Sequence, residues 1–233
     1  MIISKLFLGT VMLFSVLKCA SNNPTPEENA NTTGKRFLAL GDSYTIGQGV
    51  PASDNWPKQL AAELRADGIE IQTPQIIATT GWTTRDLANG IDQAAPQGVF
   101  DLVSLSIGVN NQYQGMPIRS FKADFVGLLG RAIQFAGGDQ AKVFVVSIPD
   151  YGVTPFGQNG NAAQISKEID EYNSIIQEVC TETGILYVDV NPISKKALSD
   201  RTLIANDGLH PSAKMYQMWV DLMEDQVSEI LKN

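Results

Sequence analysis

The sequence predicts a three-layer α/β/α domain in which helices cover both faces of a five-stranded parallel sheet. From residue 36 onward, short apolar runs alternate with segments of helix length. Most of these runs are continuously apolar, which is typical of parallel strands buried on both faces. No repeat with a period of about 20 to 50 residues is visible. Strands that alternate with helices form right-handed βαβ units, and these units build a single domain.

Five apolar runs are the predicted strands. They span residues 37–41, 69–78, 102–107, 143–148 and 185–190. The second run contains Pro74, which has no N–H to donate to a neighbouring strand and therefore favours an edge position.

Two of the helical segments have a clear apolar stripe. Residues spaced by three and four form the first stripe, Ile165, Ile169, Tyr172, Ile176 and Val179, and the second is Met215, Trp219, Leu222, Met223, Val227 and Ile230. Such spacing turns one face of a helix toward the sheet. Pro211, just ahead of the second stripe, suits the first turn of that helix. Cys180 follows Ile176 by four residues, and we expect it to be a core residue.

The N-terminus predicts export. Residues 1–19 combine an early lysine with an apolar run that is too short to span a membrane, which is typical of a signal peptide. The run ends in Cys19, in a pattern that resembles a bacterial lipoprotein box, although Lys18 stands where that pattern has a small residue. Residues 20–34 are a flexible tether, and residues 35–233 are the folded domain. We expect a lipid-anchored protein of the cell envelope, or a periplasmic or extracellular one.

Charge and cysteine content exclude several classes of protein. The formal charge is −8, and without Lys5 and Lys18 the remaining 15 basic and 25 acidic residues give −10. A nucleic-acid partner is not expected, because phosphate contacts need a basic face. The two cysteines, Cys19 and Cys180, provide no disulfide framework. One histidine and no clustered thiols leave few ligands for zinc, so we expect neither a metal nor a cofactor.

Two motifs combine into a candidate nucleophile and base. Ser43 lies just past the first predicted strand, where helix amides favour a developing negative charge. His210 is the only histidine of the chain, so any imidazole that activates a serine must be His210. Asp207, three residues earlier, is spaced to accept a hydrogen bond from one ring nitrogen of His210, while the other ring nitrogen takes the proton from the serine. Alone, each motif is more typical of an ordinary turn.

Two further residues follow other strands. Asn110, in Gly-Val-Asn-Asn after the third strand, has an amide that could donate to an oxyanion, and Gly81 follows the second strand. In parallel sheets, ligands gather outside the carboxyl ends of the strands.

Together the four blocks resemble the SGNH, or GDSL, hydrolase family. The resemblance implies a serine esterase on a flavodoxin-like sheet of order 2-1-3-4-5. It implies that Ser43 is the nucleophile, His210 the general base and Asp207 its partner. The oxyanion donors would be the Ser43 N–H, the Gly81 N–H and the Asn110 side chain. The third block departs from the family pattern, because Asn111 replaces its usual aspartate.

Other functions are weaker alternatives. Residues 47–52 match the dinucleotide pattern G-x-G-x-x-A, but they begin six residues after the strand and contain a proline, so we interpret them as a loop near the acyl pocket. No G-x-S-x-G elbow of an α/β-hydrolase occurs. The main alternative is a non-catalytic envelope protein that binds a glycan or lipid on the same fold.

The motifs predict a reaction more sharply than a substrate. The motif residues act only on the ester carbonyl and do not select the acyl group or the alcohol. The sequence has no long insertion that could form a lid, which favours small or water-soluble esters. Acetylated sugars and lysophospholipids stay open, as does the oligomeric state. Trp56, Trp82 and Tyr113 lie near predicted strand ends and are candidates to line the cleft.

Overall fold

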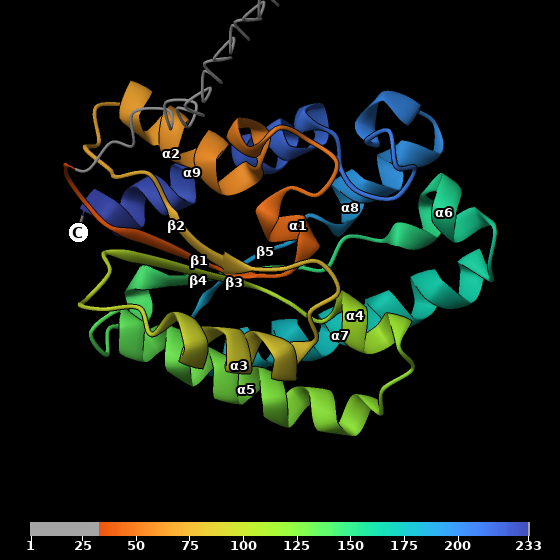
Figure 1. Ribbon diagram of the computed structural model, residues 1–233, viewed down its shortest axis with the longest axis horizontal. Helices are drawn as coiled ribbons and strands as arrows, with labels where there is room; N and C mark the ends of the chain where they lie inside the picture. Colours follow the sequence, from red (N-terminus) through yellow and green to blue (C-terminus); the bar gives the residue numbers. More distant parts are fainter. Residues whose placement is uncertain (1–32, 233) are drawn as a thin grey trace, which may run out of the picture. The chain divides into compact units, whose positions relative to one another are not determined.

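The computed structural model describes residues 33–232. This part of the chain is built around five parallel strands joined in the order β2-β1-β3-β4-β5 (Figure 1). Their bounds are β1 Phe37–Gly41, β2 Gln75–Ala78, β3 Leu102–Ser106, β4 Val143–Val146 and β5 Leu186–Val188. The predicted fold class is confirmed, and so is the strand order that the family resemblance implies.

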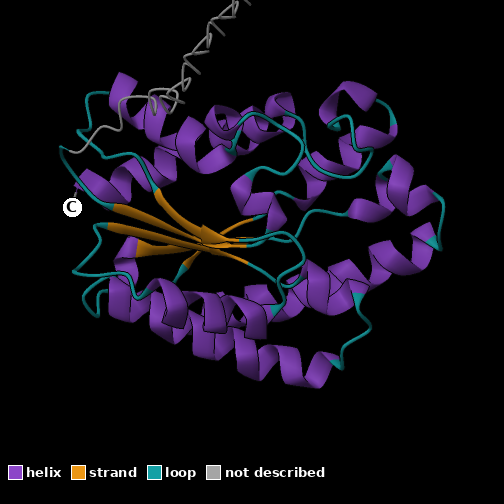
Figure 2. Ribbon diagram, viewed as in Figure 1, coloured by secondary structure: helices purple, strands orange, loops and turns teal. Residues whose placement is uncertain are grey.

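Helices cover both faces of the sheet, as the predicted three layers require (Figure 2). Helices α2 (Trp56–Ala66) and α9 (Ala213–Lys232) pack together on one face, and α3 (Thr84–Ala94), α5 (Ile118–Phe135) and α7 (Ala162–Thr183) cover the other (Figure 1). Shorter helices follow the strands: α1 Ser43–Ile46, α4 Val109–Tyr113, α6 Pro155–Gln158 and α8 Asn191–Lys195. Within residues 33–232, no helix is both long enough and apolar enough to cross a bilayer.

The strand register brings the carboxyl ends of the central strands together. Strand β1 pairs with β3 from Phe37 opposite Leu102 to Gly41 opposite Ser106. Every residue of β1, β3 and β4 is buried, as continuous apolar runs predict. Because β1 and β3 end side by side, the loops that follow them emerge at one edge of the sheet.

Aromatic side chains fill the core on both faces. On the α2 side, the Trp56 ring lies 6.3 Å from that of Phe37 and 6.1 Å from that of Phe144. On the other side, Phe121 of α5 and Tyr172 of α7 have ring centroids 4.6 Å apart. Rings at these separations add stabilisation beyond the area that they bury.

Two element boundaries differ from the sequence prediction. Strand β2 covers only the last four residues of the predicted run 69–78, because Pro74 interrupts pairing; Ile71 forms an isolated parallel bridge with Lys35. The strand does lie at the edge, as predicted. Pro211 is not in the first turn of α9, since it forms an antiparallel bridge with Ile204 and the helix begins two residues later.

Cys180 is a core residue, as predicted. It is 1% exposed in α7. Burial raises the pKa of its thiol to about 12, so the thiol stays protonated at neutral pH and is a poor nucleophile.

The predicted signal peptide and its Cys19, together with residues 20–32 of the tether, lie outside the described residues. Near the start of the described part, the Gly34 carbonyl accepts a hydrogen bond from Gln72 Nε2 at 2.9 Å, and the Lys35 N–H donates to the Glu70 carbonyl at 2.8 Å.

Candidate active site

Ser43 stands where β1 passes directly into α1. Asp42 caps the helix, since its Oδ1 accepts a hydrogen bond from the Tyr44 N–H at 3.0 Å. A Cβ on Gly41 would lie 2.1 Å from Thr45 Oγ1 and 2.6 Å from the Ser106 carbonyl oxygen. Only glycine therefore lets the helix start this close to the sheet, and the tight passage presents the Ser43 hydroxyl at the carboxyl edge.

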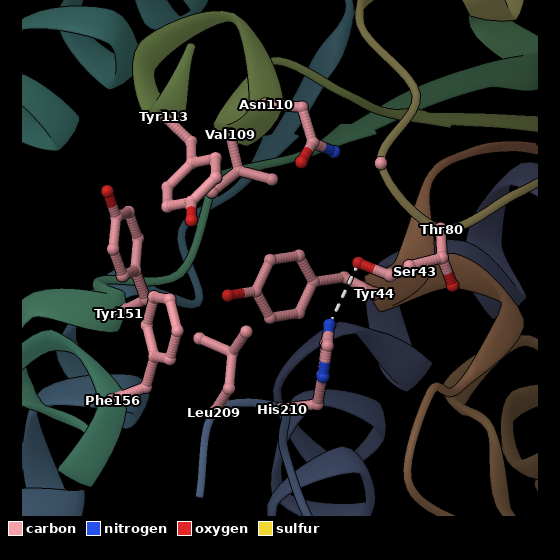
Figure 3. A pocket seen from close by; sticks show the side chains of 11 residues that line it. Ser43, Tyr44, Thr80, Val109, Asn110, Tyr113, Tyr151, Phe156, Leu209 and His210 are labelled. Atoms are coloured by element: carbon pink, nitrogen blue, oxygen red, sulfur yellow. Dashed lines mark hydrogen bonds between the residues drawn. The ribbon is translucent and has the colours of Figure 1, made fainter. Parts of the chain in front are cut away.

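His210 meets Ser43 across 167 residues of sequence. Its Nε2 lies 2.9 Å from Ser43 Oγ, and its Nδ1 lies 2.7 Å from Asp207 Oδ2 (Figure 3). These are hydrogen-bond distances. The structure thus brings together the three residues that the sequence singled out, in the order Asp–His–Ser.

The loop that carries Asp207 and His210 is fixed by its own backbone. Asp207 Oδ1 accepts the N–H groups of Leu209 at 2.9 Å and His210 at 3.0 Å, and the Ala205 N–H donates to the His210 carbonyl at 2.8 Å. Burial alone would raise the pKa of Asp207, but these hydrogen bonds and the imidazole outweigh it and lower the pKa. Asp207 is therefore ionised at neutral pH.

Three N–H donors border the same cavity as Ser43. Gly81 has φ +84°, a backbone conformation that favours glycine. Within residues 33–232, no acceptor takes the backbone N–H of Ser43 or Gly81. Asn110, in α4, donates one amide hydrogen to the Trp82 carbonyl at 2.9 Å. That bond orients the amide and leaves its second hydrogen for another acceptor.

The cavity has a volume of about 320 Å³. It opens over Ser43, between Asn110 on one side and His210 on the other (Figure 3). Among the described residues, no lysine, arginine, aspartate or glutamate lines it, and most of the lining side chains are apolar or aromatic. The full lining is Ser43, Tyr44, Thr80, Gly81, Val109, Asn110, Tyr113, Tyr151, Phe156, Leu209 and His210. The site can therefore hold a neutral, largely apolar group next to a serine hydroxyl.

Of the three aromatic candidates for the cleft, only Tyr113 lines the cavity. Trp56 is 0% exposed in the core. The Trp82 indole packs against Gly90 of α3, where an added Cβ would lie 2.1 Å from its ring. The prediction was wrong for both tryptophans, because a residue near a strand end can turn inward as readily as toward the cleft.

Much of the cavity wall consists of residues that the sequence motifs do not indicate. Tyr151 and Phe156 follow β4, where ligands are expected in a parallel sheet, so strand-end position could have identified them. Tyr44 and Leu209 are sequence neighbours of Ser43 and His210. No pattern in the sequence indicates which way their side chains point.

Asn111, the residue that departs from the family pattern, is buried and ties two helices together. Its Oδ1 accepts the Thr84 N–H at 3.0 Å, and its Nδ2 donates to Thr84 Oγ1 at 2.8 Å. Thr84 is the first residue of α3. Asn111 therefore fixes the loop that carries Gly81 against the helix that carries Asn110.

The glycine-rich loop of residues 47–50 does not line the cavity. It lies instead beside the Asp207 carboxylate, where a Cβ on Gly49 would be 3.1 Å from Oδ2. Gln48 accepts a hydrogen bond from Thr80 Oγ1 at 2.8 Å. The loop thus covers the aspartate and contacts the second strand's loop, rather than the acyl pocket.

The sequence is similar to a known protein family and to known esterases. The GDSL-like lipase/acylhydrolase family matches residues 39–218. An arylesterase of Vibrio mimicus is 27% identical over 126 residues, which are 53% of this chain and 60% of the arylesterase.

Solved structures show the same fold. The acetylxylan esterase Axe2 from Geobacillus stearothermophilus has a TM-score of 0.63 at 19% identity, covering 84% of this chain and 94% of that one. The psychrotrophic esterase EstA from Pseudoalteromonas sp. has a TM-score of 0.60 at 20% identity, covering 85% and 100%. Because the family match spans more than half of the chain and includes all four motif blocks, this protein belongs to the GDSL-like lipase/acylhydrolase family.

Proposed function

We propose that the protein is a serine esterase that hydrolyses carboxylic acyl esters through Ser43, His210 and Asp207. The observation that carries the proposal is the unbroken run of short contacts from Asp207 Oδ2 to His210 at 2.7 Å and from His210 to Ser43 Oγ at 2.9 Å. This run opens on a cavity bordered by three N–H donors. Membership of an acylhydrolase family supports the same reaction.

In the first half of the reaction, Ser43 Oγ attacks the ester carbonyl carbon while its proton moves to His210 Nε2. Asp207 accepts the Nδ1–H of His210 and stabilises the imidazolium that forms. The carbonyl oxygen becomes an anion, which the Ser43 N–H, the Gly81 N–H and the free amide hydrogen of Asn110 stabilise. The intermediate then collapses, and His210 gives its proton to the departing alcohol.

In the second half, water replaces the alcohol. His210 Nε2 takes a proton from this water, whose oxygen attacks the acyl carbon bound to Ser43 Oγ. The same three donors stabilise the second oxyanion. Collapse returns the proton to Ser43 Oγ and releases the carboxylic acid.

The substrate class that we favour is a small or water-soluble ester, such as a short-chain ester or an acetylated sugar. A cavity of about 320 Å³ without a charged lining supports neutral groups of modest size. A lysophospholipid is a further candidate, in which the phosphate would have to stay outside the cavity.

The alternative is a non-catalytic envelope protein that binds a glycan or lipid on this fold. Such a protein would not need Asp207, His210 and Ser43 at hydrogen-bond distances. A functional assignment rests on the site rather than the fold, and the geometry of this site favours catalysis.

The test is hydrolysis of p-nitrophenyl acetate by the wild-type protein and by Ser43→Ala. Loss of the nucleophile in a comparable triad costs on the order of 10⁶-fold in kcat, so Ser43→Ala should have no measurable turnover. Ser53→Ala, which changes an exposed serine outside the cavity, is the matched control. If Ser43→Ala kept more than a tenth of the wild-type rate, the proposal would be wrong.

We also propose that the protein is exported and anchored through a lipid on Cys19. The support is the sequence pattern of residues 1–19. Metabolic labelling with a radioactive fatty acid should mark the wild-type protein in membranes and leave Cys19→Ala unlabelled. Equal labelling of both proteins, or of neither, would contradict lipidation at Cys19.

A further inference from the structure

The floor of the cavity is a buried tyrosine whose hydroxyl faces the cavity. Tyr44 is 4% exposed, and its ring packs 5.3 Å from the His210 ring. Figure 3 shows the hydroxyl pointing away from Ser43, toward Tyr151 and Leu209. In the described part of the chain, this hydroxyl makes no hydrogen bond. Because this hydroxyl faces the cavity, a bound group can accept its hydrogen in place of solvent.

The far wall of the cavity is aromatic. The rings of Tyr113, Tyr151 and Phe156 lie 6.1 to 6.4 Å apart in pairs. Tyr151 is held in place because its hydroxyl donates to Gln112 Oε1 at 2.8 Å. Tyr113 and Phe156 are 59% and 42% exposed. Exposed aromatic surface beside a catalytic serine is a surface that a flat apolar group can cover.

The charges in and around the cavity restrict which part of a substrate can bind there. Within residues 33–232, the cavity lining has no lysine or arginine to pair with an anion. Asp207, which is ionised, lies directly behind His210. A carboxylate or phosphate inside the cavity would therefore lose its solvation without gaining a partner.

The geometry favours the acyl side of the ester for this space. The carbonyl oxygen must face Gly81 and Asn110, and the alcohol oxygen must approach His210 Nε2 to receive a proton. The alcohol then has to leave before water enters, whereas the acyl group stays on Ser43 through both halves of the reaction. A cavity with an aromatic wall beside Ser43 suits the group that stays.

We infer that the cavity binds a neutral aromatic acyl group with an oxygen substituent, which accepts a hydrogen bond from the Tyr44 hydroxyl. The inference rests on the proposed esterase function and names its substrate class. Tyr44 stands at the fourth position of the Gly-Asp-Ser-Leu pattern that names the family. In this chain, that position supplies both the ring under the cavity and its unpaired donor.

The experiment compares p-nitrophenyl esters, so that the leaving group is constant. Benzoyl against heptanoyl tests the aromatic preference at equal carbon number. The 4-methoxybenzoyl and 4-ethylbenzoyl esters test the proposed hydrogen bond from the Tyr44 hydroxyl. They differ only in that an oxygen in the first replaces a methylene in the second. Each kcat/KM is divided by the rate of hydrolysis in hydroxide, which removes the intrinsic reactivity of the ester.

We expect the benzoyl ester to exceed the heptanoyl ester about tenfold, and Phe156→Ala to reduce that ratio. We expect methoxy to exceed ethyl about fivefold, the effect of one hydrogen bond, and Tyr44→Phe to bring that ratio to about one. Tyr187→Phe, which alters a tyrosine of β5 outside the cavity, should change neither ratio. Because each ratio is taken within one variant, a general loss of activity does not affect it.

The outcomes separate this inference from the function on which it rests. If p-nitrophenyl acetate were hydrolysed with full dependence on Ser43 while both ratios were near one, the acyl-group inference would be wrong and the esterase proposal would stand. A methoxy preference that persisted in Tyr44→Phe would exclude Tyr44 as the donor. No turnover of any ester would reject the function itself.

Discussion

At the residue scale, the position of Ser43 depends on the two residues before it. Gly41 permits α1 to approach the sheet, and Asp42 fixes the first turn through its bond to the Tyr44 N–H. Neither touches the proposed substrate. The backbone geometry therefore fixes the position of the nucleophile, which lowers the entropic cost of aligning it with the ester carbonyl.

Replacing Asn110 tests the side-chain donor to the oxyanion. We expect Asn110→Ala to lower kcat about 10²- to 10³-fold, because that is the usual cost of one such donor. KM should change much less, since the oxyanion forms only after binding. Steady-state kinetics with p-nitrophenyl acetate give both constants. A variant with unchanged kcat and a raised KM would show that the amide binds the ground state instead.

The raised pKa of Asp42 predicts that the stability of the folded protein depends on pH. Burial raises its pKa from 3.8 to about 7, so ionisation is less favourable in the folded protein than in the unfolded one. Between these two pKa values the folded state binds more protons, so stability falls as pH rises from about 4 to about 7 and then levels off. The full effect corresponds to at most about 4 kcal/mol.

Asp42→Asn should remove this effect, because asparagine keeps the oxygen that caps α1 and carries no charge. We expect the melting temperature of the variant to fall less than that of the wild type between pH 5 and pH 8. Asp225→Asn, on the exposed face of α9, is the control. The same decrease in wild type and Asp42→Asn would contradict this role of Asp42.

The sequence predicts a residue's contacts best when the partner lies only a few positions away in the chain. Asp207 and His210 are three residues apart and His210 is unique, so their pairing could be predicted. The contact between Tyr113 and Phe156 joins segments more than forty residues apart in sequence. No local pattern encodes such a contact, so the aromatic wall became visible only in the structure.

At the element scale, Asn111 connects the N-terminus of α3 with α4. Asn111→Ala would leave the buried N–H and hydroxyl of Thr84 without this partner, at a cost of about 1 to 3 kcal/mol in unfolding free energy. Urea unfolding measures the loss.

Asn111→Asp should be milder than Asn111→Ala. An aspartate can accept both the Thr84 N–H and the Thr84 hydroxyl hydrogen, and a negative charge is favourable at the N-terminus of α3. The family's usual aspartate and this asparagine can therefore hold Thr84 in the same way. If the aspartate variant lost as much stability as the alanine variant, the explanation would fail.

Sequence predicts the elements well where one force dominates. The apolar strands β1, β3 and β4 and the amphipathic helices α7 and α9 follow from burial alone. The ends of elements depend on competing local bonds. Proline is typical of a helix start, yet Pro211 forms a bridge with Ile204, which closes the loop that holds Asp207 and His210.

At the scale of the whole molecule, the site is assembled from loops that follow different strands. Ser43 follows β1, Gly81 follows β2, Asn110 follows β3, and His210 precedes α9. These residues meet only when the parallel sheet is complete, since their loops emerge at one edge.

Unfolding should therefore abolish activity and structure together. We expect the urea midpoints of esterase activity, far-ultraviolet circular dichroism and tryptophan fluorescence to coincide. Trp56 and Trp219 are 0% exposed and report on the core. Loss of activity well below the other two midpoints would show that the site opens independently of the sheet.

The central claim is that Ser43, activated by His210, forms the acyl-enzyme. Its most direct test is peptide mass spectrometry after reaction with a p-nitrophenyl phosphonate. The serine Oγ attacks the phosphorus and displaces p-nitrophenolate, which leaves a stable phosphonyl adduct on the serine. We predict one adduct on the peptide that contains Ser43, none on Ser43→Ala, and slow labelling of His210→Ala. An adduct on another residue, or equal labelling of the wild type and His210→Ala, would contradict the claim.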